Sequence, residues 1–141
     1  MNIEEKQAEI IEEFSFLDDW MDKYEHIIEL GKELPIIAPE DKTEDKLIRG
    51  CQSRVWLHAE LPSDGLVRFT ADSDAIITKG LVAMMVRVLS GQAAEEIATC
   101  DLHFVGDIGL HEHLSPTRSN GLVAMIKQMK LYALTFSHTQ S

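Results

Sequence analysis

The spacing of apolar residues changes sharply within this 141-residue chain, and this change limits the fold more than any other feature. Within residues 53–61 an apolar face alternates with a mostly polar one, which is typical of a strand with one buried face. A turn sequence at residues 62–65 separates them from a second such segment at residues 66–71, which predicts an antiparallel hairpin. The flanking segments show helical spacing instead. The predicted fold class is therefore α+β, with helices packed on a small antiparallel sheet.

Two helices are predicted before the hairpin, within residues 3–34. Ser15 is the expected N-cap of the second helix, because acidic residues fall near its first turn. Pro35 ends that helix, since the residue before a proline avoids helical backbone angles. Residues 35–46 contain two prolines and many charges, and we expect an exposed connection there. The apolar residues that the second helix is expected to bury are Trp20, Tyr24, Ile27, Ile28 and Leu34.

Three further helices are predicted after the hairpin. Ser73 or Asp74 is the expected N-cap of the first, and the second is short, over residues 93–98. The segment that follows has no clear periodicity. Ser115 as N-cap and Pro116 as first helical residue predict the start of the last helix. The residues at helical spacing are Ile76, Ile77, Leu81, Met84, Met85 and Val88 in the first of these helices, and Leu122, Val123, Met125, Ile126, Met129, Tyr132, Ala133 and Phe136 in the last.

Length and composition are typical of one globular domain spanning residues 1–141, with 45% hydrophobic and 26% charged residues. No apolar run approaches the ~18 residues that a membrane span needs. The acidic first residues lack the basic region and apolar core of a secretory signal. Two cysteines do not make a disulfide framework, so we expect a reducing, cytoplasmic compartment.

The net charge of −11 comes entirely from the first third of the chain. Residues 1–45 contain 15 acidic residues and 4 lysines, whereas residues 46–141 contain 9 acidic and 9 basic residues. This distribution argues against binding to nucleic-acid phosphates, which requires a basic face. The acidic N-terminal helices either form a solvated surface or steer a basic partner toward it.

Cys51 is the candidate reactive residue. It lies between a charged connection and a strand, after Gly50, whose missing side chain leaves room beside the sulfur. Arg49 and Arg54 flank it, and a nearby cation favours the thiolate, which is the nucleophilic form. The alternative interpretation is a buried cysteine that acts as a small hydrophobic residue.

A cysteine hydrolase would need a histidine base beside the thiol. The sequence contains six histidines but places none of them next to Cys51. His58 lies seven residues further along the predicted strand, which is too far to contact the sulfur directly. A hydrolase is therefore disfavoured.

A metal site is a second alternative. Cys100 and His103 are spaced C-x2-H, and His111 and His113 are spaced H-x-H, so with Cys51 they supply enough ligands for zinc. These spacings match no common zinc module, and we interpret Cys100 as a half-buried small residue and the histidines as hydrogen-bonding groups. Glycine-rich phosphate-binding loops do not occur in the sequence.

The motif Gly-Cys-Gln-Ser-Arg-Val-Trp at residues 50–56 resembles the active-cysteine motif of the SufE family, the sulfur-acceptor proteins of iron–sulfur cluster assembly. Three other segments resemble the same family in order and spacing, which makes the resemblance specific. They are residues 24–31, residues 73–81 and residues 113–122. The resemblance spans about residues 10–135 and is weakest at residues 99–109.

The resemblance implies a SufE/IscU-like fold and a sulfur carrier that is not itself an enzyme. Cys51 would take sulfur as a persulfide from a pyridoxal-phosphate cysteine desulfurase of the SufS type, and would stimulate that enzyme. It would pass the sulfur to a SufBCD-type scaffold. No cofactor, nucleic acid or membrane is implied, and the protein is expected to be a monomer or a homodimer.

The resemblance also suggests two supporting residues. Asp74 matches the family's aspartate at a helix start, and Arg118 matches its arginine in the last helix. They would position or polarise the Cys51 loop, for example as an ion pair. The structural alternatives are an N-cap for Asp74 and a surface salt bridge for Arg118.

Two other functions remain as alternatives. The related IscU-like proteins are scaffolds that hold metal or an iron–sulfur cluster with several cysteines, whereas Cys51 is the one cysteine near the hairpin here. A noncatalytic adaptor that recruits a partner through its acidic helices would not need Cys51 at all.

Overall fold

The predicted hairpin is present and forms most of a three-stranded antiparallel sheet in the order β1-β2-β3. The computed structural model of the protein describes residues 1–140. Strand β1 (Val55–Glu60) pairs with β2 (Leu66–Ser73) along its whole length, and the two-residue strand β3 (Gln92–Ala93) pairs with the start of β2. Together with the helices, this sheet confirms the α+β prediction.

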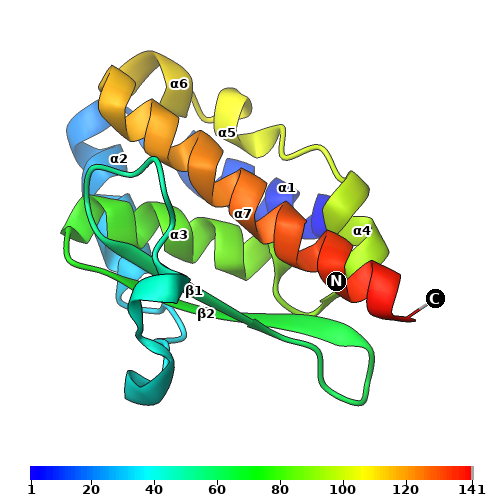
Figure 1. Ribbon diagram of the computed structural model, residues 1–141. Coiled ribbons are helices and arrows are strands. Elements are labelled where there is room, and N and C mark those ends of the chain that lie inside the picture. The colour runs from blue at the N-terminus through cyan, green and yellow to red at the C-terminus, as the bar shows by residue number, and fades with distance from the viewer. Residues whose placement is uncertain (141) are drawn as a thin grey trace.

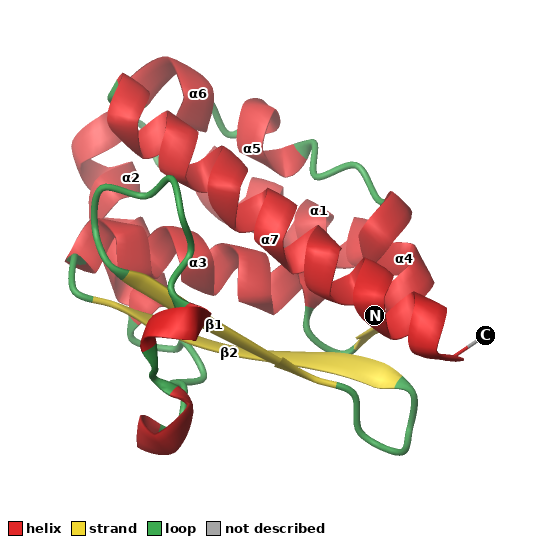
Figure 2. Cartoon of the chain, viewed as in Figure 1, coloured by secondary structure: helices red, strands yellow, loops and turns green. Residues whose placement is uncertain are grey.

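The described residues also form seven α-helices and two 3₁₀-helices, and the α-helices cover only one face of the sheet (Figures 1 and 2). None of these helices has the length and hydropathy that crossing a bilayer requires. In chain order they are α1 (Ile3–Ser15), α2 (Trp20–Gly31), η1 (Pro39–Asp41), η2 (Glu44–Lys46), α3 (Ile76–Leu89), α4 (Ala94–Thr99), α5 (Phe104–Asp107), α6 (Leu110–His113) and α7 (Pro116–Gln140).

All α-helices lie on one side of the sheet, and α3 is the central one (Figure 1). Helix α3 contacts β2, α1, α2 and α7, and all of its residues from 80 to 86 are buried. Alternation along the strands turns Leu57 and Phe69 toward this core, where both are buried. The opposite face of the sheet carries Trp56 and His58, which are only partly covered.

The connection over residues 35–46 is mostly exposed, as predicted, but it also crosses that opposite face of the sheet. At the free edge of β2, the Ile37 N–H donates to the Ala71 carbonyl at 3.1 Å, and Ile37 is only 2% exposed. At the free edge of β1, the Ile48 N–H donates to the Val55 carbonyl at 2.8 Å. The connection is therefore attached to both edges of the sheet, which the local sequence does not reveal.

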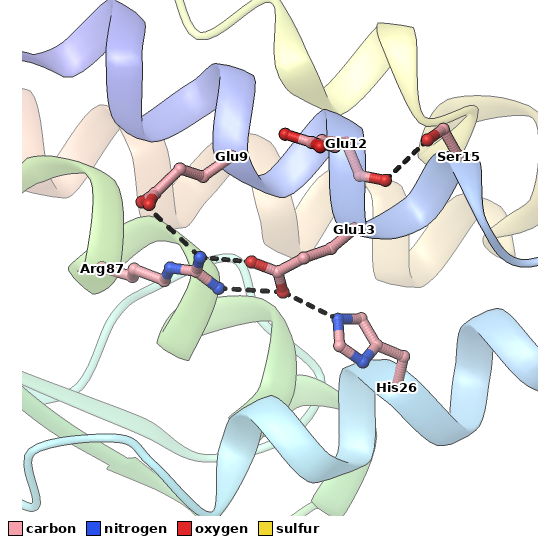
Figure 3. Close-up of polar contacts among 6 residues, drawn as sticks. All are labelled: Glu9, Glu12, Glu13, Ser15, His26 and Arg87. Carbon is pink, nitrogen blue, oxygen red and sulfur yellow. Dashed lines mark hydrogen bonds and ion pairs between the residues drawn. The ribbon is translucent and has the colours of Figure 1, made fainter.

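A polar cluster links α1, α2 and α3 (Figure 3). The Glu13 carboxylate of α1 accepts two hydrogen bonds from the Arg87 guanidinium of α3 and lies 3.0 Å from His26 Nε2 of α2. Glu9 lies 3.7 Å from the same guanidinium. The hydrogen bond from Arg87 holds the pKa of Glu13 below its usual value, although burial opposes this.

The N-cap prediction for the second helix is wrong. Helix α1 continues through Ser15, whose hydroxyl donates back to the Glu12 carbonyl at 2.6 Å. The cap of α2 is Asp19, whose carboxylate accepts the Asp22 N–H at 2.9 Å. The burial prediction holds for Ile27 and Leu34, whereas Trp20, Tyr24 and Ile28 are only partly buried.

The N-cap prediction for α3 is also wrong, because β2 extends through Ser73 and Ala75 occupies the cap position. The Asp74 carboxylate accepts a hydrogen bond from elsewhere and does not cap the helix. Ile76, expected in the core, is 66% exposed in the first turn. The start of α7 is as predicted, since the Ser115 hydroxyl accepts the Arg118 N–H at 3.3 Å.

The remaining differences lie between α3 and α7. The predicted helix over residues 93–98 begins one residue later, at Ala94, because Gln92 and Ala93 add a third strand to the sheet. The segment without periodicity contains two four-residue helices, α5 and α6, which are too short to show a hydrophobic repeat.

Replacing Gly80 with alanine is expected to destabilise the fold by about 1–3 kcal/mol or more, as overpacking does. A Cβ at Gly80 would lie 2.1 Å from the Ile27 carbonyl oxygen, so α2 and α3 would have to separate. Urea denaturation measures this change. Gly106→Ala is the matched control, because a Cβ there meets no atom within 4 Å, and it should change stability by less than about 1 kcal/mol. Equal effects of the two substitutions would contradict the packing argument.

His103 is expected to make stability depend on pH. Hydrogen bonds to Asp107 and Glu4 raise the pKa of His103 from 6.5 to about 9. Because the folded-state pKa is the higher one, its contribution is complete below about pH 6.5 and is lost as pH rises through about 9. His103→Gln should lower the unfolding free energy by about 0.5–1 kcal/mol near pH 6, where solvent screens these exposed groups, and by nothing measurable near pH 10. Denaturation at both pH values tests this, and a pH-independent loss would contradict it.

Candidate functional site

Cys51 lies on a short loop that is closed at its base by backbone hydrogen bonds. One of these is the bond from Ile48 to Val55, on either side of the loop. The second clamp is Asp74, whose carboxylate accepts the Arg54 N–H at 3.0 Å and whose own N–H donates to the Arg54 carbonyl at 3.2 Å. Together these bonds hold both ends of the loop from residue 49 to residue 54.

The tip of the loop is held much more weakly. The Cys51 thiol donates to the Gly121 carbonyl of α7 with an S···O distance of 3.5 Å, which is a weak hydrogen bond. The sulfur packs closely against α7 at Gly121, where a Cβ would lie 3.5 Å from Sγ, in ordinary van der Waals contact. Gly50 has a φ of +94°, a conformation that other residues rarely adopt, and it turns the chain into the loop.

The thiol faces a cavity of about 350 Å³ between the loop, the start of α3 and the start of α7. Its lining is mixed, with apolar side chains beside hydroxyl groups, one amide and one guanidinium. The lining residues are Cys51, Gln52 and Ser53 of the loop, Thr78 and Leu81 of α3, and Ser115, Thr117, Arg118, Gly121 and Met125 at the start of α7.

Burial raises the pKa of the Cys51 thiol above its ordinary value, because the half-buried site disfavours the charged thiolate. The sequence predicted the opposite direction, from the flanking arginines. Arg49 and Arg54 are both exposed, so their charges are solvated and do not lower this pKa. In this conformation the thiol is neutral at pH 7.

The structure separates the two predicted supporting residues. Arg118 lines the Cys51 cavity with an exposed side chain. Asp74 lies at the base of the loop and contacts Arg54. Within the part of the chain that the structure describes, Asp74 and Arg118 form no ion pair with each other, so that version of the hypothesis is wrong.

The other candidate ligands and bases are not assembled around Cys51. No histidine or carboxylate is among the described residues that line the cavity, so a cysteine–histidine pair is not present there. His113 stacks on Trp20 with ring centroids 4.0 Å apart, and His103 pairs with two carboxylates. The Cys100 thiol is half-buried and donates to the Ile97 carbonyl at 3.2 Å.

The sequence did not single out Thr78 and Thr117, whose hydroxyl groups line the cavity, and it predicted Ser115 only as a helix N-cap. The sequence nevertheless marks these positions, because all three lie in segments that resemble the SufE family. The segments do not reveal that α3 and α7 place these hydroxyls around the cavity that the Cys51 thiol faces.

Comparison with known proteins assigns the family. A family model described as "SufE: Fe-S metabolism associated domain" matches residues 8–133. The chain belongs to the SufE family. This confirms the resemblance inferred from four sequence segments, and it gives the chain a role in iron–sulfur metabolism as a sulfur acceptor.

Individual relatives agree with this assignment. An uncharacterised SufE-like protein of Rhizobium meliloti (strain 1021) is 44% identical over 126 residues, which cover 86% of this chain and 90% of that protein. Another, from Rhizobium etli, is 45% identical over 126 residues, covering 86% of this chain and 85% of its own length. The solution structure of a hypothetical protein from Thermus thermophilus shares the fold, with a TM-score of 0.78 at 21% identity over 94% of this chain and 96% of that one.

Removing the Asp74 carboxylate is expected to make Cys51 more reactive. Asp74→Ala deletes the acceptor for the Arg54 N–H, and a hydrogen bond of about 0.5–1.5 kcal/mol corresponds to a roughly two- to tenfold faster alkylation of Cys51 by iodoacetamide. Peptide mapping by mass spectrometry separates Cys51 from Cys100. Asp18→Ala is the control for charge, since Asp18 lies far from the loop in sequence and is exposed. An unchanged rate in Asp74→Ala would show that this clamp does not restrain the loop.

Proposed function

We propose that Cys51 accepts sulfur from the persulfide of a SufS-type cysteine desulfurase. In this reaction the Cys51 thiolate attacks the outer sulfur of the desulfurase persulfide. A new sulfur–sulfur bond forms on Cys51, the old one breaks, and the desulfurase cysteine leaves as a thiolate. No net oxidation or reduction occurs, and no acid–base triad is needed.

The observation that carries this proposal is the loop with two strong clamps and a weakly held tip. A sulfur carrier needs its thiol sheltered at rest and exposed at a partner. The S–H···O bond to Gly121 is the weakest attachment of the loop, whereas the bonds at Ile48 and Asp74 involve backbone groups. We infer that the tip swings outward at the desulfurase, which removes the burial that raises the thiol pKa.

Arg118 has a supporting role in this proposal. Its exposed guanidinium lines the same cavity as the thiol, and we infer that it attracts the thiolate or persulfide anion when one forms there. An arginine keeps its charge at all physiological pH values, so this support does not depend on a titration.

The further steps follow from the same proposal. The protein is a carrier and an activator of the desulfurase, not an enzyme, and it passes sulfur to a SufBCD-type scaffold. Both cysteines are free thiols, as a reducing cytoplasm requires. A cluster scaffold is the less favoured alternative, because iron–sulfur clusters are usually held by several cysteine thiolates and Cys51 is the one cysteine among the described residues that line the cavity.

Intact mass spectrometry after incubation with desulfurase and cysteine tests the proposal. Wild-type protein should gain the mass of one sulfur atom, and this gain should disappear on reduction and in Cys51→Ser. Cys100→Ser is the matched control and should still gain the sulfur. Full stimulation of the desulfurase by Cys51→Ser would instead support a noncatalytic adaptor.

Two further measurements accompany the same samples. Arg118→Gln should load sulfur more slowly at an unchanged melting temperature, whereas a merely structural arginine would lower the melting temperature. Hydrogen exchange at residues 49–54 should increase when desulfurase is added, and unchanged exchange would leave the loop movement unsupported.

A further inference from the structure

Three metal-ligating side chains converge on the sheet face that the α-helices do not cover. They are Asp41 of η1 and His58 and Glu60 of β1, and their ligand atoms all lie within 4.8 Å of one another. They do not line the Cys51 cavity. Their assembly is thus separate from the sulfur-acceptor site and does not depend on the function proposed for it.

Strand geometry and the crossing connection bring the three residues together. His58 and Glu60 are two residues apart in β1, so their side chains leave the sheet on the same face. Asp41 reaches that face because its connection is attached at both edges of the sheet. Its neighbour Lys42 lies 4.4 Å from the centroid of the Trp56 ring and bonds to Asp72 at 2.9 Å, which holds η1 against the strand.

Both carboxylates point at one imidazole nitrogen. His58 Nε2 lies 3.0 Å from Glu60 Oε1 and 3.7 Å from Asp41 Oδ2. Among the described residues, neither carboxylate is paired with a lysine or an arginine. Arg68, which lies opposite Glu60 in β2, bonds to Asp64 at 2.9 Å instead. A neutral imidazole cannot satisfy both carboxylates, since it has at most one N–H at that nitrogen.

Two of the three ligand separations bracket the value for a tetrahedral metal ion. With metal–ligand bonds of about 2.0–2.2 Å, the ligand atoms of a tetrahedral zinc site are about 3.3–3.6 Å apart. His58 Nε2 lies 3.0 Å and 3.7 Å from the two carboxylates, and the two carboxylate oxygens lie within 4.8 Å of each other. His58 Nδ1 is buried and has no hydrogen-bond partner among the described residues, so the ring offers only Nε2 to an ion from solution. Nε2 is the atom that faces both carboxylates.

We propose that Asp41, His58 and Glu60 form a Zn²⁺ site, with water in the fourth position. Imidazole with two carboxylates suits Zn²⁺, whereas Mg²⁺ and Ca²⁺ prefer sites made of oxygen ligands alone. A bound ion would neutralise the two carboxylates and link η1 to β1. It would restrain the connection that leads into the Cys51 loop, and zinc in the purified protein would not signify a cluster scaffold at Cys51.

Calorimetric titration of the full chain with Zn²⁺ tests this site. One ion should bind to wild type and equally well to Cys51→Ser, because the thiol is not a ligand. His58→Gln and Glu60→Gln should each weaken binding at least tenfold. Glu60 is largely exposed, with 64% of its side chain accessible, so its substitution leaves the fold intact. Mg²⁺ in excess should not displace Zn²⁺.

His103→Gln is the matched control. His103 also contacts two carboxylates, but through different ring nitrogens, so it cannot direct three ligands to one ion. This variant should bind Zn²⁺ as wild type does. The Co²⁺-substituted protein should absorb in the visible range without a thiolate-to-cobalt charge-transfer band. The proposal is overturned by absent saturable binding, by binding that survives in His58→Gln, or by binding that is lost in Cys51→Ser or His103→Gln.

Discussion

The close contact between α2 and α3 is the constraint on which the rest of the structure depends. Gly80 has no side chain, and the Ile27 backbone of α2 occupies the space that one would take. Helix α3 therefore lies between α2 and the sheet and contacts both. Because Thr78 and Leu81 belong to the same part of α3, the contact also positions one wall of the Cys51 cavity. Stability and site geometry therefore depend on the same few turns of helix.

The sulfur transfer that we propose for Cys51 places two opposing requirements on its site. Burial protects a thiol from oxidants and stray disulfides, but it also disfavours the thiolate that must attack. The base and the tip of the Cys51 loop are held differently. The base is attached through Asp74 and Ile48, whereas the tip, which carries the thiol, is attached only through a weak bond to Gly121. In the resting conformation protection prevails, as the raised pKa of the thiol indicates.

Much of the architecture was predictable because its signals are local. Alternation over residues 53–61 and 66–71 predicted the hairpin, and the pair Ser115-Pro116 predicted the start of α7. Predictions failed where a polar residue had two local interpretations. Asp74 is a good helix cap by type, but the end of β2 and the Cys51 loop meet there, and its carboxylate bonds to Arg54 across a sequence distance of 20 residues.

By itself the sequence determined the fold class and the family, because these follow from periodicity and from motifs along the chain, and it predicted Cys51 as the reactive cysteine. Only the tertiary structure decided the state of that cysteine. The pKa of Cys51 depends on burial by α3 and α7, which are remote in sequence, and not on the adjacent Arg49 and Arg54, whose charges water screens. The meeting of Asp41 with His58 likewise required the connection to cross the sheet, which no local pattern specifies.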